Sequence, residues 1–124
     1  MFLIRADGNA EIGVGHVMRC LSIADALKEN NKEVVFATAD NNMKSVIEGR
    51  GFSCIVLESD YKNMMSDFDN EVFPDILNQS ESIIVDSYYV SDEYFNRIRE
   101  ARKEKNDFGA FDLDAFENKL NAEG

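Results

Sequence analysis

The sequence has few of the residues from which most metal and disulfide sites are built. It holds one histidine and two cysteines in 124 residues. Cys20 and Cys54 lie far apart and form no CxxC pair, and one histidine cannot complete a usual zinc site. We therefore expect no metal and no cofactor. Both cysteines are expected to be reduced, half-buried thiols of a cytoplasmic protein.

Long apolar runs and an excess of basic residues are also missing. No run approaches the roughly 20 apolar residues of a membrane-spanning helix. The opening MFLIRAD turns polar at Arg5, which argues against a signal peptide. The net charge is −11, with 24 acidic against 13 basic residues, so no surface that coats phosphates is expected. We expect neither a membrane nor a nucleic acid as partner.

The acidic residues gather in two runs, Glu58–Asp75 and Glu104–Gly124, each with six acids against one or two lysines. Runs of this kind are usually solvated loops and tails, and we predict that both are. Residues 1–105 are assigned to one domain and residues 106–124 to an acidic tail. Within the tail, Phe111–Leu120 has the pattern of a short amphipathic helix.

Hydrophobic patterning divides the rest of the chain into alternating strands and helices. The predicted strands are Phe2–Asp7, Glu33–Ala39, Cys54–Ser59 and a segment that begins at Ser82 and runs out at Asp86. The first predicted helix is Val17–Lys28, whose apolar residues are Val17, Met18, Leu21, Ala24 and Leu27. A second is capped by Asn41 or Asn42 and runs through Glu48, and a weaker third lies around Val72–Asn78 with Pro74 in its first turn. The fourth is Asp92–Lys103, capped by Ser91. This alternation predicts a three-layer, Rossmann-like α/β fold with a doubly wound parallel sheet.

The single histidine directly follows a glycine turn in EIGVGHVMRC, Glu11–Cys20. A dinucleotide fingerprint fails at Met18, and a P-loop needs Gly-Lys-Ser/Thr where this turn ends in His16. Gly13 and Gly15 permit positive φ and let another molecule approach the backbone. His16 stands at the amino end of a helix, whose positive potential disfavours imidazolium. We expect a neutral imidazole that can accept a proton, rather than one that only packs or caps.

Other polar side chains are expected at the same edge of the sheet. Arg19 lies one helical turn after His16 and is a candidate to bind an anionic group. Asp7 and Asp86 end two strands, and either can orient His16, bond a sugar hydroxyl or cap its own loop. For Asp7, pairing with Arg5 on the same strand face is the preferred role.

Aromatic and acidic residues near these strands have separate assignments. Tyr88 is a candidate to supply a phenol to the cleft. Tyr89 and Phe95 are assigned to packing, and Glu11 is assigned to a solvated loop.

Two motifs carry a resemblance to a known family. I-R-x-D followed by I-G-x-G-H-x-x-R, here Ile4–Asp7 and Ile12–Arg19, resembles the opening of the pseudaminic-acid pathway UDP-sugar hydrolases. These are the UDP-2,4-diacetamido-2,4,6-trideoxy-beta-L-altropyranose hydrolases. A weaker likeness is the family's D-x-Y, here Asp86-Ser87-Tyr88, where many members have histidine in place of Ser87. The resemblance spans roughly the first hundred residues with compatible topology.

The resemblance implies the amino-terminal half of a GT-B-type fold, in which a carboxy-terminal domain grips UDP. It implies hydrolysis of a UDP-sugar to UDP and a free diacetamido-trideoxy sugar, with His16 as the catalytic base and without a metal or covalent intermediate. Substrate contacts are then expected from Asp7, Gly13, Gly15, Arg19, Asp86 and Tyr88.

A whole enzyme of this family needs a second domain, for which 124 residues leave no room. We therefore expect a missing carboxy-terminal domain or partner chain, weak UDP binding and little or no turnover by this chain alone. One alternative is the acceptor-side domain of a GT-B glycosyltransferase, although the acidic balance disfavours the basic-rimmed patch that a lipid-linked acceptor needs. The other is a non-catalytic fragment or interaction module that forms a homodimer through the surface its partner domain would cover.

Overall fold

The computed structural model describes residues 1–103, which form a four-stranded, all-parallel sheet. Its strands are β1 (Phe2–Ala6), β2 (Val34–Thr38), β3 (Ser53–Val56) and β4 (Ser82–Asp86), in the order β3-β2-β1-β4. The strand order reverses between β1 and β4, which makes the sheet doubly wound, as predicted. The predicted acidic tail, with its helix at Phe111–Leu120, lies outside the described residues.

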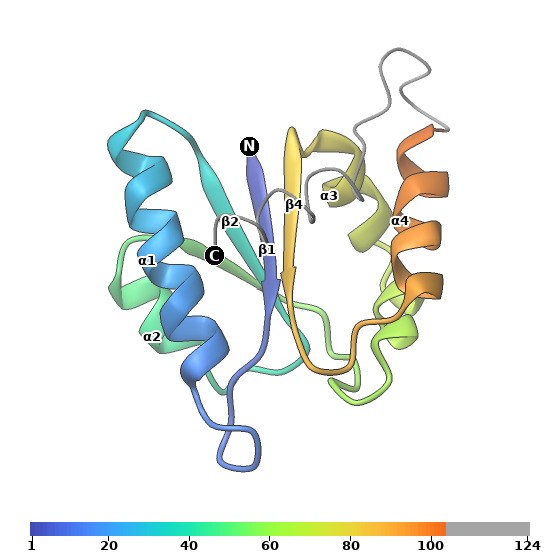
Figure 1. The fold of residues 1–124 in the computed structure, drawn as a ribbon, viewed down its shortest axis with the longest axis horizontal. Coiled ribbons are helices and arrows are strands. Elements are labelled where there is room, and N and C mark those ends of the chain that lie inside the picture. The colour runs from blue at the N-terminus through green and yellow to red at the C-terminus, as the bar shows by residue number, and fades with distance from the viewer. Residues whose placement is uncertain (104–124) are drawn as a thin grey trace.

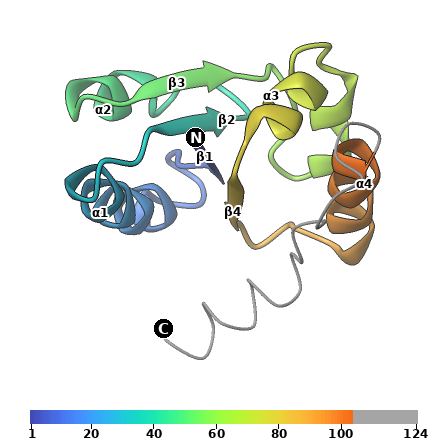
Figure 2. The same ribbon diagram turned by 90° about the horizontal axis from the view of Figure 1, so that it is seen from above.

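Helices cover both faces of the sheet and complete three layers (Figures 1 and 2). On one face lie α1 (Gly15–Glu29) and α2 (Lys44–Gly49). On the other lie α3 (Phe73–Gln79), α4 (Asp92–Lys103) and the 3-10 helix η1 (Met64–Asp69). None of the helices in this part of the chain is both long enough and apolar enough to cross a bilayer.

The alternation along β1 separates two apolar cores. Leu3 belongs to the core under α3 and α4, whereas Ile4 and Ala6 belong to the core under α1 and α2. Arg5 and Asp7 follow Leu3 on its side, as the period of two predicts. Paired residues of neighbouring strands share a face, so Asp86, which pairs with Ala6, is placed on the α1 side.

The inner stripe of α1 differs from the predicted one at one residue. Val17, Cys20, Leu21 and Ala24 are buried, at spacings of three, four and seven from Val17. Met18 was predicted to be among them but is 41% exposed. One step from Val17 turns the side chain about 100° around the helix, away from the sheet.

Of the three helices for which a cap or a first-turn proline was predicted, two have it in the structure. The Ser91 hydroxyl accepts the Tyr94 N–H at 3.2 Å, which caps α4, and Pro74 lies in the first turn of α3. The predicted cap of α2 by Asn41 or Asn42 is wrong. Met43 occupies the cap position, and no side chain bonds to the free N–H groups of that turn.

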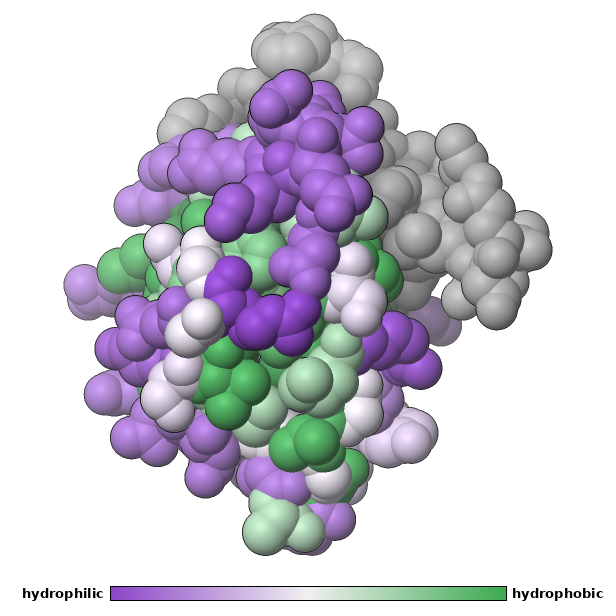
Figure 3. All heavy atoms as spheres, turned by 90° about the vertical axis from the view of Figure 1, so that its left-hand side faces the viewer, coloured by the Kyte–Doolittle hydropathy of each residue, from purple (hydrophilic) through white to green (hydrophobic). Residues whose placement is uncertain are grey.

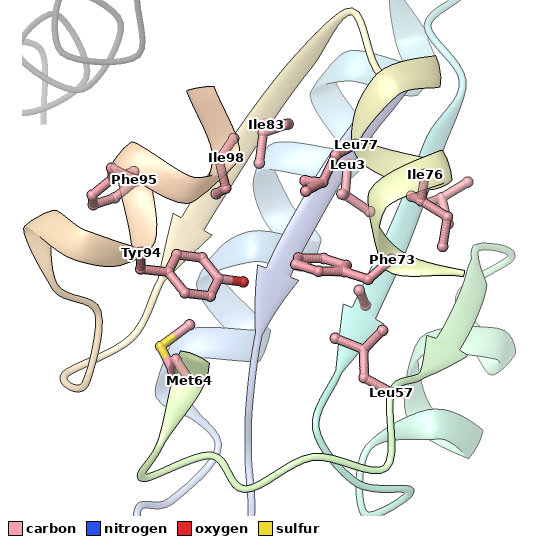
Figure 4. Close-up of a cluster of buried hydrophobic side chains, with 12 residues drawn as sticks. Leu3, Leu57, Met64, Phe73, Ile76, Leu77, Ile83, Tyr94, Phe95 and Ile98 are labelled. Carbon is pink, nitrogen blue, oxygen red and sulfur yellow. The ribbon is translucent and has the colours of Figure 1, made fainter. Parts of the chain in front are cut away.

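The prediction that the acidic run Glu58–Asp75 is a solvated loop is wrong. The run contains η1 and the start of α3, and it buries Met64 and Asp67. Met64 packs in the core with Leu57, Phe73 and Tyr94 (Figure 4). Asp67 is fully enclosed because it pairs with a buried cation from β1.

The cation is the Arg5 guanidinium, which is 0% exposed. Its Nε donates to Asp67 Oδ2 at 2.8 Å, and its Nη1 donates to Asp7 Oδ2 at 2.8 Å. The Tyr94 and Ser59 hydroxyls each donate to Asp67 at 2.6 Å. We call these five residues the Arg5 hub. Burial opposes the charge on Arg5, but the bond and charge of Asp67, and then the charge of Asp7, raise its pKa above the ordinary value.

The Arg5 hub ties together the segments at the carboxyl edge of the sheet. Asp7 follows β1, and its Oδ1 accepts the N–H of Ala39, just after β2, at 2.7 Å. Ser59 follows β3, and Tyr94 comes from α4 with its hydroxyl toward the sheet (Figure 4). Burial, followed by the charge of Asp67, raises the pKa of Tyr94 well above the ordinary value, so its hydroxyl stays a donor.

Replacing Asp67 by asparagine should destabilise the chain strongly. The Asp67→Asn variant leaves the buried Arg5 without its main counter-ion, and breaking a buried ion pair costs roughly 3–5 kcal/mol. Urea denaturation would measure the loss. Asp69→Asn is the matched control, since Asp69 is in the same helix but exposed. Its effect should stay within about 0.5 kcal/mol. Equal effects of the two variants would contradict a stabilising role for the hub.

Candidate functional site

The candidate site lies where the order of the strands reverses. The chain leaves β1 toward α1 on one face, and it leaves β4 toward α4 on the other (Figure 1). Asp86 is the last residue of β4, next to Ala6 of β1. His16 is in the first turn of α1. Divergence of the chain at this point leaves the ends of two adjacent strands open to ligands in folds of this kind.

The glycine turn before α1 is closed by its own hydrogen bonds. Asn9 and Gly13 exchange backbone bonds of 3.1 and 2.8 Å, and the Asn9 side chain accepts two more N–H groups of the turn. Gly13 has φ of 78°, as the sequence suggests, but Gly15 does not use a positive φ and begins α1 instead. A Cβ at Gly15 would meet no atom within 4 Å, so the space beside it is open.

His16 and Asp86 form a close pair. The His16 Nδ1 lies 2.6 Å from Asp86 Oδ1. Burial raises the pKa of Asp86, but the bonds from Arg19 and His16 outweigh it and hold that pKa below the ordinary value. An ionised carboxylate only accepts hydrogen bonds, so the proton of a neutral imidazole is assigned to Nδ1 from these partners. Its Nε2 then carries the lone pair.

The other ring nitrogen of His16 is buried without a hydrogen-bond partner in residues 1–103. The residue is 9% exposed. The Tyr88 ring meets it at 4.5 Å between centroids, nearly perpendicular, while Tyr88 itself is 77% exposed. An unpaired buried nitrogen is uncommon in proteins and calls for an explanation, such as a bound water or a catalytic role.

Arg19 binds the carboxylate of Asp86 with two parallel bonds. Its Nε donates to Oδ2 at 2.8 Å and its Nη2 to Oδ1 at 2.7 Å. The bond and charge of Asp86 raise the pKa of Arg19. The anion that Arg19 was predicted to bind is therefore, in this structure, a carboxylate of the chain itself. Binding of a substrate anion by Arg19 stays a prediction.

Cys20 is a member of the site that the sequence prediction missed. Its Sγ lies 3.6 Å from Asp86 Oδ2 and can donate its proton to that oxygen. Burial, followed by the charge of Asp86, raises the pKa of this thiol to about 12. Its position four residues after His16, on the same helix face, is the signal that could have identified it.

Asp7 does not join His16. Its two carboxylate oxygens bond to Arg5 and to the Ala39 N–H, and the residue is 3% exposed. The predicted pairing of Asp7 with Arg5 is confirmed. Asp7 and Asp86 end neighbouring strands on opposite faces of the sheet, which is why only Asp86 reaches α1. A contact between Asp7 and a substrate stays a prediction.

A second loop contacts the glycine turn. Glu11, predicted to be solvated, is exposed, but it pairs with Lys62 at 2.7 Å and accepts the Tyr61 hydroxyl. The Lys62 bond, followed by the Tyr61 bond, lowers the pKa of Glu11. The Tyr61 ring packs on Tyr89 at 5.8 Å, in line with the packing role predicted for Tyr89. Phe95, also assigned to packing, is buried in the core.

The fold and the site together define a Rossmann-like α/β domain with a histidine–aspartate pair at its switch point. No group of three or more histidine, cysteine, aspartate or glutamate residues in the described chain is arranged to hold a metal ion.

Comparison with known proteins gives one curated relative. The uncharacterized protein MJ1062 of Methanocaldococcus jannaschii is 33% identical over 102 residues, which are 81% of this chain. The chain spans only 19% of the length of that relative. No family model matches the chain, and no solved structure matches it.

The two cysteines should differ in reactivity toward a thiol reagent. With a pKa of about 12, Cys20 is ionised in only about one molecule in ten thousand at pH 8, and it is buried. Half-buried Cys54 should therefore react first, and Cys20 only when the chain unfolds. Asp86→Asn should accelerate labelling of Cys20, because it removes the charge that, after burial, contributes most to the raised pKa of this thiol. Mass spectrometry of the labelled peptides distinguishes the sites, and faster labelling of Cys20 than of Cys54 in the native chain would contradict the geometry.

Proposed function

We propose that this chain is the amino-terminal catalytic domain of a cytoplasmic nucleotide-sugar hydrolase that releases UDP and a free sugar. The observation that carries the proposal is the His16–Asp86 pair, in which Nδ1 is bonded and Nε2 has no partner among the described residues. A base oriented by a carboxylate is one arrangement that general-base catalysis uses. The substrate class, a UDP-sugar, is proposed from the resemblance of the motifs around Asp7, His16 and Asp86 to those of the UDP-sugar hydrolases.

In the proposed reaction, which requires water to reach the Nε2 atom that is buried in this structure, His16 Nε2 takes a proton from a water molecule as the water oxygen attacks the anomeric carbon. The bond from that carbon to the UDP oxygen breaks, and UDP leaves with the electron pair. Asp86 keeps the ring oriented through Nδ1 and stabilises the imidazolium that forms. The diphosphate would approach the first turn of α1 beside Gly15, where free N–H groups attract anions. The N–H of Gly13 already bonds to Asn9.

The nucleotide half of the site is proposed to come from a second domain or a partner chain. The M. jannaschii relative supports this organisation, because the matched region is a small part of a longer protein. Apolar residues beside His16 give a second domain a surface to contact, since Val14 and Met18 are 48% and 41% exposed. Large exposed apolar side chains that lie together often mark such contacts.

The interaction-module alternative is favoured by a separate observation. Apolar side chains gather on the α1 and α2 side of the molecule, among polar ones (Figure 3). Three large apolar residues of the α1 and α2 segments are exposed, Val14, Met18 and Val46. A module that forms homodimers through this surface would sediment as a dimer at high concentration. A monomer under those conditions removes the main support for this alternative.

Release of UDP from a UDP-diacetamido-trideoxy sugar should depend on His16. The substrate would be incubated with the chain alone and with the product of a neighbouring gene as a source of the second domain, and UDP would be followed by chromatography. We expect little release by the chain alone. In the complemented mixture, His16→Ala should lower kcat by roughly 100-fold or more, the usual contribution of a general base.

Arg50→Ala is the matched control for this experiment. Arg50 lies at the end of α2, at the opposite edge of the sheet from His16, and pairs with Asp25 on the surface. The control should keep the activity of the unmodified chain. UDP release that survives His16→Ala unchanged would remove the assignment of the base.

A further inference from the structure

The contacts of Asp86 carry an inference about Arg19 and Cys20. We infer that these two are positioning residues, which hold the Asp86 carboxylate in the one orientation that keeps the His16 proton on Nδ1. The inference rests on the proposed function for its catalytic meaning. It assigns Arg19 a role other than the direct contact with a substrate anion that the motif suggests.

Both oxygens of the carboxylate are occupied by donors from one helix. Oδ1 accepts from His16 Nδ1 at 2.6 Å and from Arg19 Nη2 at 2.7 Å. Oδ2 accepts from Arg19 Nε at 2.8 Å and lies 3.6 Å from Cys20 Sγ. Residues 16, 19 and 20 share one face of α1 because they are separated by three and four positions. A single helix face therefore surrounds a carboxylate that ends β4.

The guanidinium suits this task because it is planar and rigid. Two parallel N–H bonds to one carboxylate fix the rotation of the carboxylate as well as its position, which a lysine ammonium cannot do. The Asp86 side chain is 15% exposed, so little solvent competes for its oxygens. Cys20 fills the remaining position on Oδ2 with a neutral donor.

The orientation of Asp86 decides between two proton positions on His16. Arg19 Nη2 lies 3.3 Å from His16 Nδ1, so with the proton on Nε2 the bare Nδ1 could accept from Arg19. The ionised carboxylate at 2.6 Å is the closer partner and needs a proton on Nδ1. Arg19 therefore supports the catalytic proton position only while it stays bonded to Asp86. When the two bonds from Arg19 are lost, the Asp86 carboxylate can rotate away from His16 Nδ1.

A substrate-binding role and a positioning role have different kinetic consequences. The two nitrogens of Arg19 that face Asp86 are occupied. If Arg19 acts through Asp86, its removal lowers kcat and leaves KM nearly unchanged. If it binds a substrate anion, its removal raises KM.

The test uses the fact that the chain has a single histidine. Labelling histidine with 15N gives one pair of ring signals, whose positions report which nitrogen carries the proton. Spectra of the full chain would be recorded at about pH 9, where an ordinary imidazole is neutral. The variants are Arg19→Ala, Arg19→Lys and Cys20→Ala, with Arg50→Ala as the control, and circular dichroism shows that each is folded.

The unmodified chain and Arg50→Ala should show the proton on Nδ1. In Arg19→Ala the ratio of the Nδ1–H to the Nε2–H form should fall about tenfold, the effect of losing a well-oriented charge-assisted hydrogen bond. Arg19→Lys should restore part of the ratio, and Cys20→Ala should lower it less. An unchanged ratio in a folded Arg19→Ala overturns the inference. If Arg19→Ala does not fold, Arg19→Lys is the test. A ratio in folded Arg19→Lys equal to that of the unmodified chain then overturns the inference.

These spectra need no substrate, so they separate the two proposals. A changed proton position without any UDP release by the complemented chain would remove the hydrolase and leave the positioning role. UDP release that depends on His16, with an unchanged proton position and a raised KM in Arg19→Ala, would remove the positioning role and leave the hydrolase.

Discussion

The enclosure of one positive charge organises the carboxyl edge of the sheet in this domain. A buried guanidinium is unfavourable unless carboxylates and hydroxyls surround it, and Arg5 obtains these from segments that are distant in sequence. Asp7 holds the end of β2, and Asp67 brings η1 and α4 against the sheet. The segments that follow β1, β2 and β3 are thereby fixed relative to one another. The turn that leads to α1 and His16 begins directly after Asp7, a member of the Arg5 hub.

Local patterns were sufficient to predict the architecture. Apolar runs separated by helical periods predicted the four strands and the four α-helices of residues 1–103 in the right order, although η1 was missed. The inner strands β1 and β2 are easy to recognise because they are covered on both faces of the sheet. The strand ends also located the candidate site. Asp86 ends a strand and His16 follows a turn, so their meeting at one edge could be predicted from topology alone. The period of two likewise predicted that Arg5 pairs with Asp7.

The details of the site depended on contacts that no local pattern contains. Asp67 is 62 positions from Arg5 and looks like one more acid in a solvated run. Asp67 differs from the other acids of that run only because the buried Arg5 needs a counter-ion. The choice between Asp7 and Asp86 as partner of His16 required the strand register, which places the two on opposite faces of the sheet. Cys20 was hidden by the assumption that cysteines matter chiefly as metal or disulfide ligands.

The loop that Asn9 and Gly13 close upon themselves has a consequence for recognition. Four of its backbone N–H groups, those of residues 9, 11, 12 and 13, are bonded within the loop, which restricts the conformations that the loop can adopt. Preorganised surfaces lose less conformational entropy on association, and they discriminate by shape because they do not adapt. If the proposed site binds a ligand, the open space beside Gly15 gives that ligand access to the backbone next to this rigid turn.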